Sequence, residues 1–146
     1  WEEHQALSSD PNINPNFIKP RDFMFRLQKI MDEYAGGVSM QFTTNKFLLD
    51  RGSELMVMLQ EDSEKLAAED HHELMRAWEN IHRMWQAEAH IRTLLFREET
   101  RWPGYYYRAD FTEMDEDNWK CFANCIYDPD KGEWEMVKRE ILSIVD

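Results

Sequence analysis

The sequence lacks the features of three common classes of protein. It has no apolar run of about 18 or more residues, the length that a membrane-spanning helix needs. It has no Gly-x-Ser-x-Gly nucleophile elbow, and Gly36-Gly37 has no third glycine at the spacing of a phosphate-binding loop. A membrane-spanning segment, a serine hydrolase site and a nucleotide site are therefore not expected within these residues.

Cysteine is also scarce, since the only two are Cys121 and Cys125. The residues around them favour a strand, where a rise of about 3.3 Å per residue separates the two Cα atoms by about 13 Å, too far for a disulfide. We therefore expect two buried free thiols. Free thiols suit a reducing compartment, which predicts a cytoplasmic location.

Basic residues are outnumbered, because 17 Lys and Arg face 29 Asp and Glu, for a net charge of -12. Such a surface repels phosphate backbones and anionic lipids, so neither nucleic acid nor membrane insertion is expected. The content of large apolar groups, 42% hydrophobic and 13% aromatic, is far too high for a disordered chain. We expect residues 1–146 to fold as a single domain, cut from a longer polypeptide because the first residue is Trp1.

Hydrophobic periodicity predicts three helices between residues 21 and 97. The first ends at the Gly36-Gly37 pair, the second begins at a cap on Thr44 or Asn45, and the third begins at a cap on Asp70. Each helix has one apolar stripe, so burying all three requires a bundle. The predicted stripes are Phe23, Leu27, Ile30, Met31 and Tyr34, then Leu48, Gly52, Leu55, Leu59, Asp62 or Ser63, and Leu66, then Leu74, Trp78, Ile81, Trp85, Ala89 and Phe96.

A β-hairpin is predicted at the C-terminal end. Strand-forming residues occupy 119–127 and 133–138, and the turn-forming segment 128–132 separates them. The predicted fold is therefore mainly α: an irregular segment over 1–20, a spectrin-repeat-like three-helix bundle over 21–97, a loop over 98–117, and the hairpin with its tail over 118–146.

The third helix carries many possible metal ligands, but their spacing does not favour a metal site. Glu79 and His82 form one Glu-x-x-His pair, whereas di-iron bundles need two such pairs and two further Glu. A solvated or ion-paired helix face is the prediction, and a metal-binding bundle is the minor alternative. The set is His71, His72, Glu79, His82, Glu88 and His90.

The loop from Thr100 to Asp110 is the most unusual segment, because it combines two Arg with four large rings outside any periodic element. Arg and aromatic residues are enriched where proteins bind one another. The alternative is that the rings close the end of the bundle and each Arg pairs with Glu98, Glu99 or Asp110. The predicted interface residues are Arg101, Trp102, Tyr105, Tyr106, Tyr107, Arg108 and Asp110.

The same loop carries a family resemblance. The segments "ETRWPGYYYRADF" and "DEDNWKCF" resemble the C-terminal region of the flavoprotein (alpha) subunits of dissimilatory adenylylsulfate reductases. Those subunits belong to the wider fumarate reductase and succinate dehydrogenase flavoprotein family, whose related segment reads Ser-Arg-Gly-x-His-x-Arg-x-Asp. Arg101, Arg108 and Asp110 match that pattern, while Trp102-Pro103 and Tyr106 depart from it.

The resemblance implies a parent subunit that binds FAD, pairs with an iron-sulfur beta subunit, and interconverts adenylyl sulfate with sulfite and AMP by a two-electron step. It implies no catalytic, cofactor-binding or metal-binding residue within this chain, because the FAD-binding part of such subunits has no counterpart here. The expected role is a structural domain that packs on the flavin-binding domain and lies near the subunit contact, inactive alone. The alternative is a freestanding, acidic, helical protein-interaction module.

Overall fold

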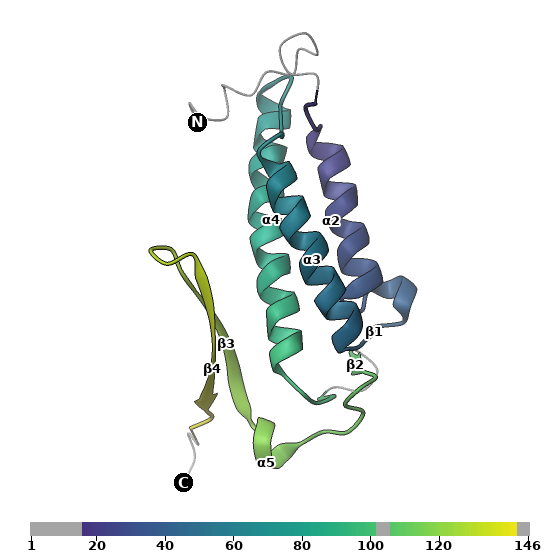
Figure 1. Ribbon diagram of the computed structural model, residues 1–146, viewed down its shortest axis with the longest axis vertical. Coiled ribbons are helices and arrows are strands. Elements are labelled where there is room, and N and C mark those ends of the chain that lie inside the picture. Colours follow the sequence, from purple (N-terminus) through teal and green to yellow (C-terminus); the bar gives the residue numbers. More distant parts are fainter. Residues whose placement is uncertain (1–15, 102–105, 143–146) are drawn as a thin grey trace.

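A computed structural model describes residues 16–101 and 106–142. Three helices lie side by side in it: α2 (Pro20–Tyr34), α3 (Lys46–Ser63) and α4 (His71–Phe96) (Figure 1). Short links join consecutive helices, so the chain runs alternately up and down the bundle. The predicted mainly helical three-helix bundle is confirmed, and the observed limits differ from 21–97 by one residue at each end.

Local side-chain chemistry sets the ends of these helices. The Asn45 side chain accepts a hydrogen bond from the backbone N–H of Leu48 at 2.9 Å, and Asp70 accepts one from the N–H of Glu73 at 2.8 Å. Both bonds satisfy backbone donors that a helix start leaves unpaired. Gly36 follows α2 with a φ of 75°, the left-handed conformation that commonly ends a helix.

The core lies between the three helices. On α3 its members include Leu49 and Met56, one position after the predicted Leu48 and Leu55, which are only partly buried. The remaining buried apolar side chains of this cluster are Ile18, Phe23, Leu27, Ile30, Ala35, Leu59, Leu66, Met84, Ala87 and Ile91.

The prediction that Trp78 and Trp85 belong to the core is wrong, because the two residues are 40% and 36% exposed. A helix turns by about 100° per residue, and buried residues of α4 lie one position before each of the two tryptophans. The tryptophans therefore point away from the core. Small residues such as Ala77 and Ala87 are among the buried residues, which lets the helices approach closely. The buried residues of α4 are Leu74, Ala77, Asn80, Met84, Ala87, Glu88 and Ile91.

The predicted C-terminal hairpin is confirmed as strands β3 (Cys121–Asp128) and β4 (Glu133–Glu140), which pair antiparallel. Its first strand begins later than predicted, because Trp119 ends the short helix α5 (Glu116–Trp119) instead. An aspartate caps that helix by accepting a hydrogen bond from the N–H of Asn118. Both cysteines are free and half-buried.

The hairpin packs against α4 through three aromatic rings. The Trp85 ring centroid lies 4.8 Å from that of Tyr127 and 5.8 Å from that of Trp134, and the two hairpin rings lie 4.9 Å apart. The guanidinium of Arg92 stacks 5.6 Å from the Trp134 ring. Trp85 therefore serves a second apolar stripe on α4, on which the hairpin rests beside the bundle (Figure 1).

Replacing Trp85 with Ala should loosen the hairpin without unfolding the bundle. Each aromatic pair contributes about 0.5–1.5 kcal/mol beyond its buried area, and the change removes two. We expect amide hydrogen exchange across β3 and β4 to accelerate by about tenfold or more, whereas α2 and α3 stay protected. Trp78→Ala is the matched control, since the Trp78 ring packs edge-on against His82. Equal exchange in both variants would refute the assignment.

A short parallel ladder ties the C-terminal loop to the start of α3. Strand β1 (Thr43–Thr44) pairs with β2 (Tyr107–Arg108), so the prediction of an uninterrupted loop over 98–117 is wrong here as well as at α5. The ladder requires a distant partner strand, which local sequence does not reveal.

None of the helices in the described part of the chain has both the length and the apolar character that a membrane span requires.

Candidate functional site

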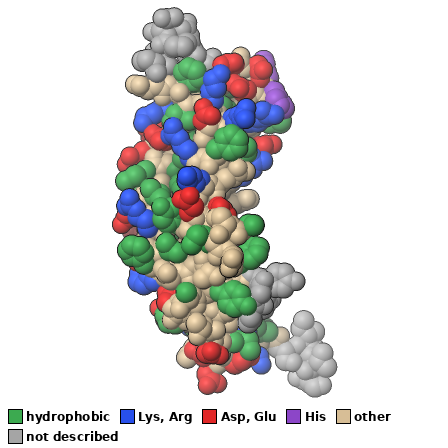
Figure 2. Space-filling view, turned by 90° about the vertical axis from the view of Figure 1, so that its right-hand side faces the viewer, with side chains coloured by type: hydrophobic (Ala, Val, Ile, Leu, Met, Phe, Trp, Pro, Cys, Tyr) green, Lys and Arg blue, Asp and Glu red, His purple; other side chains and the backbone are tan. Residues whose placement is uncertain are grey.

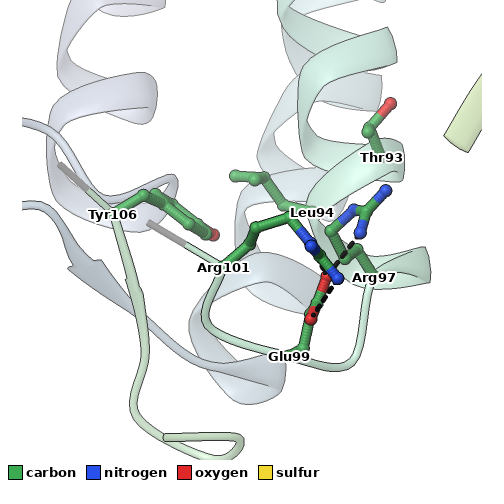
Figure 3. Close-up of a pocket in the computed structure, with 6 residues that line it drawn as sticks. All are labelled: Thr93, Leu94, Arg97, Glu99, Arg101 and Tyr106. Atoms are coloured by element: carbon green, nitrogen blue, oxygen red, sulfur yellow. Dashed lines mark hydrogen bonds and ion pairs between the residues drawn. The ribbon is translucent and has the colours of Figure 1, made fainter. Parts of the chain in front are cut away.

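Three alternating charged residues converge directly after α4. The Glu99 carboxylate is fully buried and accepts hydrogen bonds from the guanidiniums of Arg97 and Arg101, the latter at 2.6 Å (Figure 3). The backbone N–H of Asp115 donates to the other Glu99 oxygen at 3.0 Å. Arg101 also reaches Glu116 at 2.7 Å. One buried carboxylate thereby joins the end of α4 to the segment that leads into α5.

These contacts keep Glu99 ionised. Burial alone would raise the pKa of Glu99, but the hydrogen bonds from Arg101, the Asp115 backbone and Arg97 outweigh burial and hold that pKa below its ordinary value. The carboxylate and the two guanidiniums carry a combined charge of about +1. A carboxylate engaged in this way is a structural anchor and not a proton-transfer group.

A cavity of about 290 Å³ opens beside this cluster. Tyr106 forms the opposite wall, with its hydroxyl pointing into the space (Figure 3). That hydroxyl is buried and has no hydrogen-bond partner among the residues described. Burial raises the pKa of Tyr106, so the phenol stays protonated and can donate. The lining residues are Thr93, Leu94, Arg97, Glu99, Arg101 and Tyr106.

Arg108 closes the C-terminal end of α4. Its side chain is only 1% exposed, and its guanidinium donates hydrogen bonds to the carbonyls of Leu94 and Arg97, the second at 2.9 Å. These carbonyls belong to the end of a helix, where no further turn supplies a donor. The same guanidinium donates two hydrogen bonds to the carboxylate of Asp110, at 2.9 and 2.8 Å.

Asp110 extends this connection to the start of α3. Its carboxylate accepts a hydrogen bond from the backbone N–H of Lys46 at 2.9 Å, in the first turn of that helix. The hydrogen bonds from Arg108 hold the pKa of Asp110 below its ordinary value, against the opposing effect of burial. The Arg108–Asp110 pair thus links the end of α4 with the beginning of α3.

The structure separates the predicted interface residues into two groups. Arg108 points inward and is 1% exposed, the Asp110 and Arg101 side chains are 26% and 25% exposed, and Tyr107 is 39% exposed. The alternative prediction, that each Arg pairs with a nearby acid, is confirmed for Arg101 with Glu99 and for Arg108 with Asp110. Trp102 and Tyr105 lie outside the described residues. A role in a protein contact stays a prediction.

The polar set on α4 does not assemble a metal site in the described chain, where no three His, Cys, Asp or Glu side chains gather as ligands. Glu88 instead accepts hydrogen bonds from Arg92 at 2.7 Å and from Gln60. His82 packs against Trp78. The prediction of an ion-paired helix face is confirmed for Glu88 and for Glu79, which pairs with Arg83.

The cluster around Glu99 was not predicted, although its residues show a recognisable spacing. Arg97, Glu99 and Arg101 alternate at intervals of two residues. In an extended chain this spacing places all three side chains on one side. The helix was predicted to end near Arg97, so the period of two could have identified the three-residue cluster.

This chain is similar to known proteins over nearly its whole length. The family model described as "Fumarate reductase flavoprotein C-term" matches residues 25–143. Adenylylsulfate reductase subunit alpha from Megalodesulfovibrio gigas is 50% identical over 145 residues, which are 99% of this chain and 22% of that protein. The chain therefore spans about a fifth of the length of this relative.

Solved structures agree in fold. Adenylylsulfate reductase from the hyperthermophile Archaeoglobus fulgidus superposes with a TM-score of 0.89 at 50% identity, covering 99% of this chain and 23% of that one. The quinol fumarate reductase flavoprotein of E. coli superposes with a TM-score of 0.70 at 20% identity, covering 99% and 26%. The second likeness concerns the fold alone.

Proposed function

Because the chain belongs to the family of fumarate reductase flavoprotein C-terminal domains, we propose that it is the C-terminal helical domain of an adenylylsulfate reductase alpha subunit. The parent enzyme would bind FAD and interconvert adenylyl sulfate with sulfite and AMP by a two-electron step, in the cytoplasm. The observation that carries this proposal is 50% identity to such a subunit over 99% of the chain. A freestanding interaction module is less favoured, because it does not explain this sequence identity.

The residues of this chain do not fit a dinucleotide site. Such a site needs glycines that begin a helix and bring its N-terminal N–H groups to the phosphates. Here Gly36 ends α2, and a Cβ at this position would lie 3.1 Å from the Tyr106 ring. FAD would accordingly be held by polypeptide outside these 146 residues, and the isolated chain would be inactive.

The role of the domain would be structural. The Glu99 cluster anchors Arg101, the Arg108–Asp110 pair anchors the chain after Tyr107, and both leave Tyr107 and part of Arg101 at the surface. Exposed aromatic and Arg side chains on a fixed backbone are the features of an interface hot spot. The loop would therefore contribute to the contact with the iron-sulfur beta subunit or with the flavin-binding domain.

The coding sequence upstream of Trp1 tests the parent enzyme directly. An in-frame continuation into a strand, a Gly-x-Gly-x-x-Gly turn and an acidic residue about 20 positions later is the expected result. The full-length subunit should then show flavin absorbance, and the 146-residue chain should show none. A start codon immediately upstream of Trp1 would exclude the flavoprotein assignment.

Replacing Tyr107 with Ala in the full-length subunit should weaken subunit assembly. Truncating a hot-spot aromatic costs about 2 kcal/mol or more, which predicts at least a tenfold loss of affinity. Tyr107 has no ion pair to lose, so its removal spares the Glu99 cluster. The double variant Arg101→Ala/Trp102→Ala extends the test to the neighbouring residues.

Affinity for the beta subunit and turnover of adenylyl sulfate are the two measurements. Phe47→Ala is the matched control, since Phe47 is a 78% exposed ring on α3. Circular dichroism of each variant separates loss of contact from loss of fold. Normal assembly and turnover in both loop variants would refute the contact proposed for this loop.

A further inference from the structure

Ion pairing singles out two arginines on one side of the bundle. Of the 17 Lys and Arg in the chain, 13 form an ion pair with a carboxylate of the described residues. The others are Arg21, Arg76, Lys138 and Arg139. In a chain of net charge -12, carboxylates are abundant, so an unpaired guanidinium is unusual. Two of the four, Arg21 and Arg76, line the same cavity.

That cavity lies between α2 and α4 and measures about 460 Å³. Arg83 borders it and also borders a second cavity of about 570 Å³ further along the same two helices. The two cavities adjoin at Arg83 along the same pair of helices, and together we call them the α2–α4 groove. It extends along α4 from Arg76 to His90, a length of about 21 Å at the rise of an α-helix.

The walls of the groove combine apolar surface with positive charge. Phe25, 49% exposed, and the half-buried Met24 form its apolar wall near the start of α2. Arg21 stacks 5.3 Å from the Phe25 ring, which leaves its N–H groups available to an incoming acceptor. Figure 2 looks onto the α2 side of the bundle and shows apolar side chains interspersed with basic and acidic ones along its length.

The carboxylates that also border the groove are already engaged. Glu79 pairs with Arg83 at 3.0 Å, and Asp32 accepts a hydrogen bond from the backbone N–H of Ser39 at 3.0 Å. No ion pair joins Arg21 or Arg76 to a carboxylate of residues 16–101 and 106–142, so within this part of the chain their positive charge stays unneutralised at one end of the groove. A ligand that fits must bring carboxylates together with apolar side chains.

The direction of the chain indicates where such a ligand comes from. The polypeptide that precedes Asn16 joins the bundle next to Pro20, which lines the groove at the end where Arg21 and Arg76 lie. The first residues of the present sequence include Glu2, Glu3 and Asp10. Any upstream part of a full-length subunit is therefore tethered to this end of the bundle, where its effective concentration is high.

We propose that the α2–α4 groove binds an acidic, partly apolar stretch of the polypeptide that precedes Asn16 in the full-length subunit. Carboxylates of that stretch pair with Arg21 and Arg76, and its apolar side chains cover Met24 and Phe25. This inference rests on the proposed function, because it requires a longer parent chain. It places a contact within one polypeptide at the groove, separate from any contact that the Arg101–Asp110 loop makes.

Zero-length carbodiimide crosslinking of the full-length subunit tests the groove. Arg76→Lys keeps the positive charge and introduces a primary amine that couples only to a carboxylate in direct contact. We expect mass spectrometry to find this amine joined to an Asp or Glu located before Asn16 in the same polypeptide. The crosslink should be lost in Arg76→Gln. Arg26→Lys on the other side of α2 is the control and should couple to Asp62, its present partner.

Subunits mixed from normal and heavy-isotope cultures separate crosslinks within one chain from those between copies. Coupling of position 76 to a second copy, to the beta subunit, or only to Glu79 would overturn the proposal, as would no coupling at all. Flavin content and adenylyl sulfate turnover, measured on the same preparation, test the proposed function independently. A turning-over flavoprotein without the expected crosslink would refute the groove assignment alone.

Discussion

Replacing Arg108 with Met should lower the free energy of unfolding by about 3–5 kcal/mol, the cost of leaving one member of a buried ion pair without its partner. The Arg108 guanidinium is almost wholly buried and donates to the Asp110 carboxylate and to the carbonyls of Leu94 and Arg97. Methionine keeps an unbranched apolar stem but donates no hydrogen bond, so the two carbonyls lose this donor and the Asp110 carboxylate keeps only the backbone N–H of Lys46. Urea unfolding of the 146-residue chain at pH 7 measures the loss.

Two further variants show whether the loss comes from the buried pair. Arg51→Met removes an arginine that is half exposed and pairs with Glu54, and it should cost about 1 kcal/mol or less. Arg108→Met/Asp110→Leu removes both charges and should recover part of the stability, but not the part that the two helix-end carbonyls contribute. A loss in Arg108→Met no greater than in Arg51→Met would contradict the role assigned to Arg108.

The helices could be predicted because their signals are local. The caps at Asn45 and Asp70 act on backbone N–H groups three residues ahead, and Gly36 ends α2 through its own backbone conformation. The hairpin turn is local for the same reason, with Gly132 at a φ of 69°. Interactions within a few residues are present in any short segment of the sequence, so a pattern can reveal them.

The side of each helix that faces the core could not be predicted in the same way. On α4, two apolar stripes compete, and the large rings of Trp78 and Trp85 outweigh Ala77 and Ala87 when residues are judged by hydrophobicity alone. The small residues are buried because the helices approach closely. Gly52 on α3, which was correctly placed on the predicted stripe, shows how close this approach is, since a Cβ there would lie 2.9 Å from Cβ of Tyr34. Such closeness is a property of pairs of helices.

The contacts of the candidate site also fall into two kinds, those that local sequence predicts and those that only the fold brings about. That Arg101 has a nearby acid in Glu99 follows from their spacing in the sequence. That Arg108 binds the carbonyls at the end of α4 requires the chain to return to that helix, which the pairing of β2 with β1 brings about. Both arginines matched the family pattern, and only the structure distinguishes the buried one, Arg108, from Arg101 at the surface.

This division bears on the proposed function. Residues that match a family motif are often assumed to bind substrate or cofactor, yet here Arg108 and Asp110 connect two helix ends. Arg108 and Asp110 therefore have a structural role, while the side chain of Tyr107, 39% exposed, is available for contact. The proposed structural role of the domain is consistent with both observations.

Replacing Glu99 with Gln should lower the free energy of unfolding by about 2–4 kcal/mol at pH 7, because a buried carboxylate that accepts charged hydrogen bonds becomes a neutral amide. Arg97 and Arg101 would then share a partner without charge. Gln keeps the size of Glu, so cavity formation makes no contribution. Glu61→Gln, on an exposed position of α3, is the control and should change the free energy by about 0.5 kcal/mol or less.

The pH dependence of this difference is specific to Glu99. The pKa of Glu99 in the folded chain lies below its ordinary value of 4.5, so the folded state binds protons less readily than the unfolded state. A group of this kind stabilises the fold fully above pH 4.5, and that stability is lost as the pH falls through the lowered folded pKa. The difference in the free energy of unfolding between the wild type and Glu99→Gln should therefore be constant near neutrality and shrink on acidification.

Urea unfolding of both proteins from pH 7 down to about pH 3 measures this difference, over a range that covers the usual spread of Glu pKa values. A difference that stays constant to the acid limit would mean that Glu99 contributes through its shape and not through its charge.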